Sequence, residues 1–147
     1  MAINISDKPI QKRTAKAMGK LFLSPGSINR IKSKRVEKGD PLENARLAAI
    51  HAVKKTPELV FMAHPIPIEG VKTELNVNEA ENAIILTCSV TSTAKTGVEI
   101  EALAGVMNGL LAIFDMVKMY EKDFEGNYPL STRIDNVCVL SKKKEDL

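Results

Sequence analysis

GVEIEALAGVMNGLLAIFDMVK, residues 97–118, decides the fold, because it predicts a long helix that is apolar around most of its circumference. A helix that packs on one sheet needs only one apolar stripe. This segment has a wider apolar surface, formed by Val98, Ile100, Leu103, Val106, Met107, Leu110, Leu111, Ile113, Phe114, Met116 and Val117. We therefore expect part of the helix to pack within the chain and a second copy of the chain to cover another part, which predicts a homo-oligomer.

The same helix carries polar side chains at a regular spacing. Glu101, Asn108 and Asp115 are seven residues apart and so lie on one stripe, with Lys118 one turn beyond Asp115. One interpretation is an ordinary solvated face on which Asp115 and Lys118 form a surface ion pair. At a rise of about 1.5 Å per residue, Glu101 and Asp115 are about 21 Å apart. If both ends of the stripe are catalytic, either the chain has two sites or a neighbouring subunit completes each one.

The segments around this helix predict the order β-α-β-β-α-β. The helix that begins at residue 41 has a clear start, since Asp40 can cap it, Pro41 suits its first position and Glu43 completes a capping box. Pro57 ends that helix. The expected strands cover residues 14–23, 71–77, 83–90 and 132–140, the other expected helices cover 28–35 and 97–121, and a turn is expected at 24–27. This order is typical of a ferredoxin-like α+β fold, an antiparallel sheet with helices packed on one face.

Length and composition predict a single cytoplasmic domain over residues 1–147. The chain has 44% hydrophobic residues, which is enough apolar content for one core. Its start, MAINISDKPIQKR, has no apolar run typical of a signal peptide, and its longest uncharged stretch, residues 102–114, is shorter than a membrane helix. Cys88 and Cys138 lie far apart in apolar stretches. This placement favours buried free thiols over a disulfide or a zinc site.

Several polar positions have both a structural and a functional interpretation. His64, in an extended segment, is either a ligand-binding imidazole or a histidine hydrogen-bonded to the loop backbone. Lys38 precedes a capped helix start, where anions are attracted by backbone donors as well as by the cation. Glu99 and Glu101 point to opposite sides if both are helical and to the same side if the chain there is extended.

Basic runs leave a nucleic-acid alternative open. KSKR at residues 32–35 and KKK at residues 142–144 are most often solvated surface, but ferredoxin-like domains with basic patches also bind RNA. The chain has only four Phe and two Tyr, and it lacks the aromatic strand signature of such RNA-binding domains. It also lacks a glycine-rich phosphate loop, so a bound phosphate must be held by side chains or helix ends.

Four motifs in order resemble the cyclic pyranopterin monophosphate synthase family, the molybdenum cofactor biosynthesis protein C family. The motifs are ISDKP with KRTAKAMGKL near the start, KGDPLENARLAAIHAVKKTPELV in the middle, AHP, and TGVEIEALAGVMNGLLAIFDMVK. Together they cover nearly the whole chain. The resemblance implies a ferredoxin-like fold, a homohexamer built from dimers, and active sites between subunits. We expect no cofactor and no metal-ligating residues, and whether a divalent metal accompanies the triphosphate is left open.

The resemblance also implies a reaction. Family members convert 3',8-cyclo-7,8-dihydroguanosine 5'-triphosphate into cyclic pyranopterin monophosphate and release pyrophosphate. The implied substrate is thus a small nucleotide triphosphate, and neither nucleic acid nor a membrane is an expected partner. A catalytically silent relative and an RNA-binding module remain the alternatives.

Site residues follow from the matching motifs. Asp115 and Lys118 match the catalytic pair of the family, and Lys38 matches its other catalytic lysine. The matching substrate-contacting positions are Arg13, Met62, Ala63, His64, Glu99, Ile100 and Glu101. The chain has SKKKEDL at residues 141–147, where the family has a lysine, a glycine pair and another lysine. We take Lys142 as the equivalent of the first of these lysines, and so as a further substrate-contacting residue. The cations suit a triphosphate, and the carboxylates suit the amino and ring N–H groups of guanine.

Overall fold

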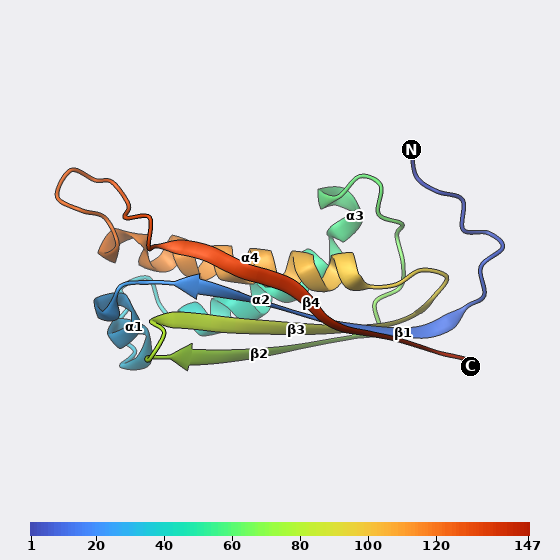
Figure 1. Ribbon diagram of the computed structural model, residues 1–147, viewed down its shortest axis with the longest axis horizontal. Helices are drawn as coiled ribbons and strands as arrows, with labels where there is room; N and C mark the ends of the chain where they lie inside the picture. Colours follow the sequence, from blue (N-terminus) through green and yellow to red (C-terminus); the bar gives the residue numbers. More distant parts are fainter.

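The computed structural model describes residues 1–147 and has the expected ferredoxin-like α+β architecture (Figure 1). Its four strands form one antiparallel sheet in the order β2-β3-β1-β4. The strands are β1 (Gln11–Phe22), β2 (Gly70–Asn78), β3 (Ala83–Ala94) and β4 (Arg133–Glu145). The helices are α1 (Pro25–Lys32), α2 (Pro41–Lys54), α3 (Thr56–Leu59), α4 (Glu99–Val117) and the short 3-10 helix η1 (Lys118–Tyr120).

Alternating small and branched side chains make one face of the sheet apolar. Ala15 of β1 lies opposite Val90 of β3, Ala17 lies opposite Cys88, and all four are buried. The intervening residues of both strands are only partly buried. Because α4 packs on β1, β3 and β4 while α2 packs beside α4, the core lies between this face and the two helices.

The expected turn at residues 24–27 is wrong, because these residues begin α1. Ser24 is the N-cap, and its Oγ accepts a hydrogen bond from the Ser27 backbone N–H. Pro25 takes the first helical position, where its missing N–H costs no hydrogen bond. The same residue types favour a turn and a helix start, so their pattern does not distinguish the two.

The expected start of α2 is confirmed in part. The carboxylate of Asp40 accepts hydrogen bonds from the backbone N–H groups of Leu42 and Glu43, as a cap should. The expected capping box is wrong, since the Glu43 side chain pairs with Arg46 one turn further on. α2 ends at Lys54, ahead of Pro57, and a separate single-turn helix, α3, follows.

α4 approaches its neighbours closely because two glycines lie on its inner side. A Cβ at Gly105 would lie 2.8 Å from the sulfur of Cys88, and one at Gly109 would lie 2.5 Å from Leu86 Cδ2. The buried side of α4 includes Ala102, Val106, Leu110, Ile113 and Val117. On the outer side, Ile100, Met107 and Leu111 are 44%, 51% and 54% exposed. α4 is therefore more apolar than packing within one chain requires.

Length and composition alone would allow residues Glu99–Tyr120 to span a membrane. Half of that segment is buried inside the fold, where α4 packs on α2 and the sheet. A core helix meets the same length criterion, so this property says little about a membrane.

Both cysteines are free, but only one is buried. Burial raises the pKa of the Cys88 thiol to about 11. The expectation of burial is wrong for Cys138, because it lies on the edge strand β4 and pairs with Met18, whose side chain lies on the face of the sheet away from α4.

Candidate functional site

Three of the candidate residues meet at the C-terminal end of α4 and form the Asp115 cluster. Lys118 Nζ lies 3.3 Å from Asp115 Oδ1, and Lys38 Nζ lies 3.6 Å from Asp115 Oδ2. Lys38 Nζ also donates a hydrogen bond of 2.9 Å to the main-chain carbonyl of Asp115. One carboxylate therefore holds two ammonium groups that come from separate parts of the chain.

The local sequence explains how these groups meet. Asp115 lies in the last turn of α4, and Lys118 begins η1 on the same side three residues later. Lys38 comes from the loop between α1 and α2, where Gly39 adopts a φ of +126° that residues with a Cβ rarely adopt. The hydrogen bond from Lys118, followed by the charge of Lys38, lowers the pKa of the Asp115 carboxyl. The cluster thus holds an ionised carboxylate between two cations.

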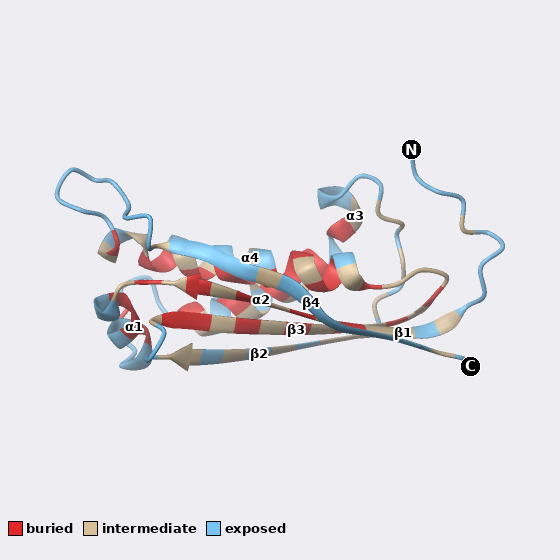
Figure 2. Cartoon of the chain, in the orientation of Figure 1, coloured by how far each residue is buried: buried red, intermediate tan, exposed pale blue.

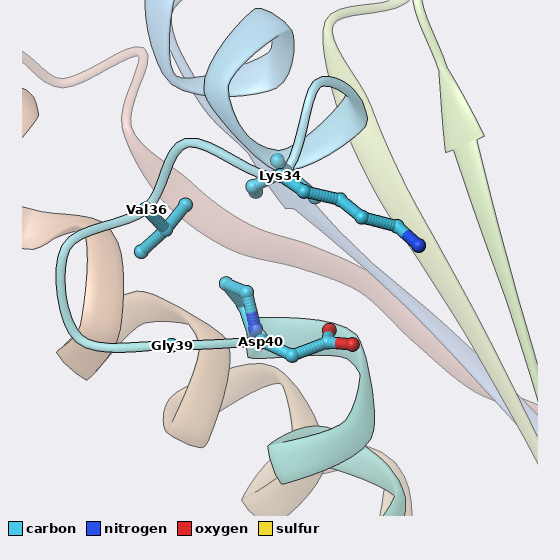
Figure 3. Close-up of a pocket in the computed structure, with 6 residues that line it drawn as sticks. Lys34, Val36, Gly39 and Asp40 are labelled. Atoms are coloured by element: carbon cyan, nitrogen blue, oxygen red, sulfur yellow. The ribbon is translucent and has the colours of Figure 1, made fainter.

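The Asp115 cluster is open to solvent. The side chains of Lys38, Asp115 and Lys118 are 40%, 61% and 42% exposed. Lys38 lines a wide depression of about 590 Å³ together with Asp40, Glu43, Asn44, Leu47 and Met116. A smaller pocket of about 160 Å³ is formed by the same loop, and Figure 3 shows it between Lys34, Val36, Gly39 and Asp40. The wide depression leaves room for a ligand beside Lys38.

A second group of candidates, the Glu99 cluster, lies at the start of α4. Lys142 of β4 forms a 2.8 Å ion pair with Glu99, and Arg13 of β1 lies in the same depression. Partial burial raises the pKa of Glu99, but the hydrogen bond and charge of Lys142 and the charge of Arg13 outweigh it, so the pKa is lowered overall. Arg13 Nε is buried without a hydrogen-bond partner, which leaves a donor free for a ligand or a water.

Glu101 points away from the Glu99 cluster. Glu99 and Glu101 are both in the helix, so their side chains point to opposite sides of it, which is one of the two arrangements expected from the sequence. Glu101 is only 3% exposed, lies in a cavity of about 80 Å³ lined by Pro57, Pro65 and Ile66, and leaves its Oε2 without a hydrogen-bond partner. Burial, together with the charge of Glu99, raises the pKa of this carboxyl. The two glutamates therefore differ in the protonation that their surroundings favour.

The segment Met62–His64 lies at this same end of the fold. Met62 is 56% exposed and Ala63 is half-buried. His64 Nε2 lies 2.7 Å from the main-chain carbonyl of Ile3, so at present it has the loop-histidine role that was one of its two interpretations. Ile100, another candidate contact residue, is exposed on α4.

The Glu99 cluster and the Asp115 cluster lie at opposite ends of helix α4. Glu99 and Asp115 are sixteen residues apart on α4, about 24 Å along the helix. Figure 1 shows the start of α4 near α3 and both termini, while its end lies near α1 and the loop before β4. The fold of one chain therefore does not bring the candidate residues together.

The polar stripe on α4 faces α2 rather than solvent along most of its length. Glu101 is buried beside Val53 and Lys54 of α2, and Asn108 donates a hydrogen bond to the main-chain carbonyl of Ala48. Only Asp115, at the end of the stripe, is exposed. A uniformly solvated face is therefore wrong as a description, although Asp115 and Lys118 do form an exposed ion pair.

A buried carboxylate that the sequence pattern did not single out, Glu121, lies just beyond η1. It accepts hydrogen bonds from the backbone and hydroxyl of Ser24 and from the hydroxyls of Ser27 and Thr132. Burial raises its pKa, but these hydrogen bonds lower it more, so the pKa falls overall. Ser24 is nearly one hundred residues away along the chain, so no local spacing indicates this contact.

No group of three or more His, Cys, Asp or Glu side chains is placed to hold a metal ion. The charged groups at both clusters are instead mostly lysine and arginine, which are ligands for anions rather than for metals.

Comparison with known proteins gives matches along nearly the whole chain. The model of the MoaC family matches residues 2–145. A Pyrococcus horikoshii protein named probable cyclic pyranopterin monophosphate synthase is 48% identical over 97% of this chain and 87% of its own. A Thermoplasma acidophilum protein of the same name is 45% identical over 97% of each chain. A Methanothermobacter thermautotrophicus protein named probable cyclic pyranopterin monophosphate synthase accessory protein is 43% identical over 99% of this chain and 89% of its own.

Proposed function

Because the chain belongs to the MoaC family, we propose that it catalyses the formation of cyclic pyranopterin monophosphate, a step in molybdenum cofactor biosynthesis. The family expected from the sequence is confirmed by the match over residues 2–145 and by relatives that are 43% to 48% identical. The proposed activity is that of a lyase. In this proposal residues 1–147 act as a single catalytic domain in the cytoplasm.

The proposed substrate is 3',8-cyclo-7,8-dihydroguanosine 5'-triphosphate, and the proposed by-product is pyrophosphate. This molecule combines a polyanionic end with a purine end that is rich in N–H donors. Conversion of the purine part requires proton transfers, and departure of pyrophosphate requires that negative charge be stabilised. A site for this reaction therefore needs cations that stabilise the negative charge. It also needs acidic groups with different pKa values, so that one can give a proton and another can accept one.

The single observation that carries the proposal is the Asp115 cluster, in which one carboxylate lies within 3.6 Å of two lysine ammonium groups. We assign the catalytic roles to Lys38, Asp115 and Lys118. Each ammonium can donate a proton or stabilise charge that develops on a phosphate oxygen, and Asp115 orients both. Because all three side chains are exposed and Lys38 lines a wide depression, substrate can reach them without unfolding the chain.

The Glu99 cluster supplies the proposed substrate-binding residues. Arg13 and Lys142 present cations to an anionic group, while Glu99 can accept hydrogen bonds from guanine N–H groups. Glu101 lies in its own cavity with an unpartnered oxygen, so it too can accept such a bond. Met62, Ala63, His64 and Ile100 are the remaining proposed contacts.

We propose that each site is completed by a second subunit. Two observations support this: the clusters are about 24 Å apart on one helix, and a large apolar surface is uncovered. Figure 2 shows β4 exposed along almost its whole length beside the exposed side of α4. Ile134, Val139 and Leu140 of β4 add to the exposed side chains of Met107 and Leu111. A homohexamer built from dimers, as in the family, would cover this surface.

Purified protein incubated with the cyclised GTP intermediate tests the function. Pyrophosphate and cyclic pyranopterin monophosphate should form in equal amounts, and GTP itself should yield neither. If the folded protein binds the intermediate without converting it, the catalytically silent alternative holds instead. Tight RNA binding that the intermediate does not displace would favour the RNA-binding alternative, which the family match does not favour.

A further inference from the structure

A hydrogen bond links the loop that carries Lys38 to the turn that carries Lys118. The hydroxyl of Tyr120, in η1, accepts a 3.0 Å hydrogen bond from the backbone N–H of Glu37. Glu37 immediately precedes Lys38, and Tyr120 follows Lys118 by two residues. One side-chain hydroxyl thus joins the two elements whose lysines share Asp115.

The ring of Tyr120 is held in place from the side of α1. The guanidinium of Arg30 lies 4.2 Å from the ring centroid, which is cation–π geometry. Arg30 also donates a hydrogen bond to the carbonyl of Arg35, in the loop between α1 and α2. Arg30 therefore contacts both the tyrosine ring and the loop that the tyrosine hydroxyl binds.

The backbone of η1 is fixed by the next residue. Glu121 is 5% exposed, and its carboxylate accepts hydrogen bonds from Ser24, Ser27 and Thr132. Glu121 is thus hydrogen-bonded to α1 and to the residue before β4, and Tyr120 precedes it directly. The hydroxyl of Tyr120 is a fixed point for the loop.

The loop has few other attachments to this end of α4. Its internal backbone hydrogen bonds join Lys34 to Ile31, Arg35 to Arg30 and Gly39 to Val36. Across to α4 and η1, the hydrogen bonds are the one to Tyr120 and the one that Lys38 itself makes to Asp115. Arg35 of the loop also accepts a hydrogen bond from Arg30, and Val36 is buried in the core. Without the tyrosine hydroxyl, however, the only hydrogen bond from the loop to α4 or η1 would be the one that Lys38 itself makes.

We propose that Tyr120 is a positioning residue for Lys38. Its hydroxyl fixes the backbone at Glu37, so that Lys38 Nζ reaches Asp115 without an added loss of loop entropy. The effect of Tyr120 on turnover rests on the proposed function. Its effect on the position of Lys38 does not depend on the reaction.

Tyr120→Phe tests the proposal, because it removes the hydroxyl and keeps the ring over Arg30. Tyr128→Phe is the matched control, since Tyr128 is the other tyrosine of the chain and packs on Phe114 instead. A hydrogen bond of ordinary strength predicts about a fivefold to tenfold fall in kcat for Tyr120→Phe, with a change in KM of less than about twofold. The control should leave both constants unchanged.

A second measurement is independent of turnover. Limited labelling with an amine-reactive reagent, read by peptide mass spectrometry, should modify Lys38 faster in Tyr120→Phe than in the unaltered protein, because its ammonium leaves Asp115 more often. Lys72, whose side chain is 77% exposed on β2, is the internal reference and should not change. If the protein has no activity at all, this labelling still tests the role of Tyr120.

Two results would overturn the proposal. The first is a Tyr120→Phe protein with unaltered kcat and unaltered Lys38 labelling. The second is a fall in kcat with unaltered Lys38 labelling and a large fall in thermal stability, which would indicate that the hydroxyl supports the fold in general.

Discussion

Lys38 and Asp115, which are 77 positions apart in the sequence, are joined by a hydrogen bond and by an ion pair. The lysine ammonium binds the carbonyl of Asp115 in the last turn of α4, where the helix leaves unpaired carbonyls and a partial negative charge. The carboxylate of the same residue also holds Lys118. The end of one helix therefore gathers two cations at one point on the surface.

Replacing Lys118 with Ala should lower kcat at least about a hundredfold, because a positioned proton donor is lost. The free energy of unfolding should change by less than about 0.5 kcal/mol, since an exposed ion pair contributes little. Steady-state kinetics and thermal denaturation measure the two effects. Lys72→Ala is the control, because Lys72 forms an exposed ion pair with Glu74 on the edge strand β2. Full activity in Lys118→Ala would refute the catalytic assignment.

Replacing Glu101 with Gln should leave the protein as stable at pH 7 as the unaltered chain, or more stable by about 1 kcal/mol. The folded pKa of Glu101 is raised, so its favourable contribution is present at low pH and is lost as pH rises through the raised pKa. The neutral amide of Gln does not ionise, so the variant does not lose this stability as the pH rises. Denaturant unfolding should show the difference at pH 7, and the difference should vanish near pH 4. A marked destabilisation at pH 7 would show that the ionised carboxylate has a partner in the assembly.

Replacing Glu121 with Gln should destabilise the fold at pH 7 by about 2 kcal/mol, because charged hydrogen bonds to Ser24 and Thr132 are weakened. The folded pKa of Glu121 is lowered, so its contribution is present above the ordinary glutamate pKa of about 4.3 and is lost as pH falls through the lowered value. The gap between variant and unaltered protein should therefore close in acid. Glu125→Gln, in the exposed neighbouring loop, should have no effect.

Replacing Leu111 with Glu should convert the proposed oligomer to smaller species without unfolding the chain. Leu111 is 54% exposed on α4, so a glutamate there is tolerated in one chain but cannot be buried unpaired between two. Analytical ultracentrifugation measures the mass, and circular dichroism checks the fold. Lys72→Glu on β2 is the control. A Leu111→Glu protein with the mass of the unaltered assembly would place the interface elsewhere.

Local chemistry predicted most of the elements that make up the fold. Alternation predicted the strands around Ala17 and Cys88, and the pair Asp40-Pro41 predicted the start of α2. The regular rise of a helix also predicted that Glu101 and Asp115 lie far apart, which holds in the structure. These features depend on residues that are close in the sequence.

The wrong turn at residues 24–27 is a local ambiguity, because the same residue types favour a turn and a helix start. Contacts between distant residues account for most of the rest that the sequence did not predict. The hydrogen bonds of Glu121 to α1 and of Tyr120 to Glu37 span more than eighty residues. The exposure of Cys138 depends on the place of β4 at the edge of the sheet, which alternation does not indicate. The catalytic and binding roles themselves came from the family motifs, because an exposed aspartate–lysine pair is also common on ordinary surfaces.

The most direct test of a site shared between subunits mixes two inactive variants. Lys118→Ala lacks a residue of the Asp115 cluster, and Glu99→Ala lacks the carboxylate of the Glu99 cluster, about 24 Å away on the same helix. After the two proteins are dissociated and reassembled together, some sites should contain an intact Lys118 from one subunit and an intact Glu99 from the other. Activity towards the cyclised GTP intermediate should then return to a fraction of that of the unaltered protein. If mass spectrometry shows mixed oligomers and no activity returns, the two clusters do not form one site.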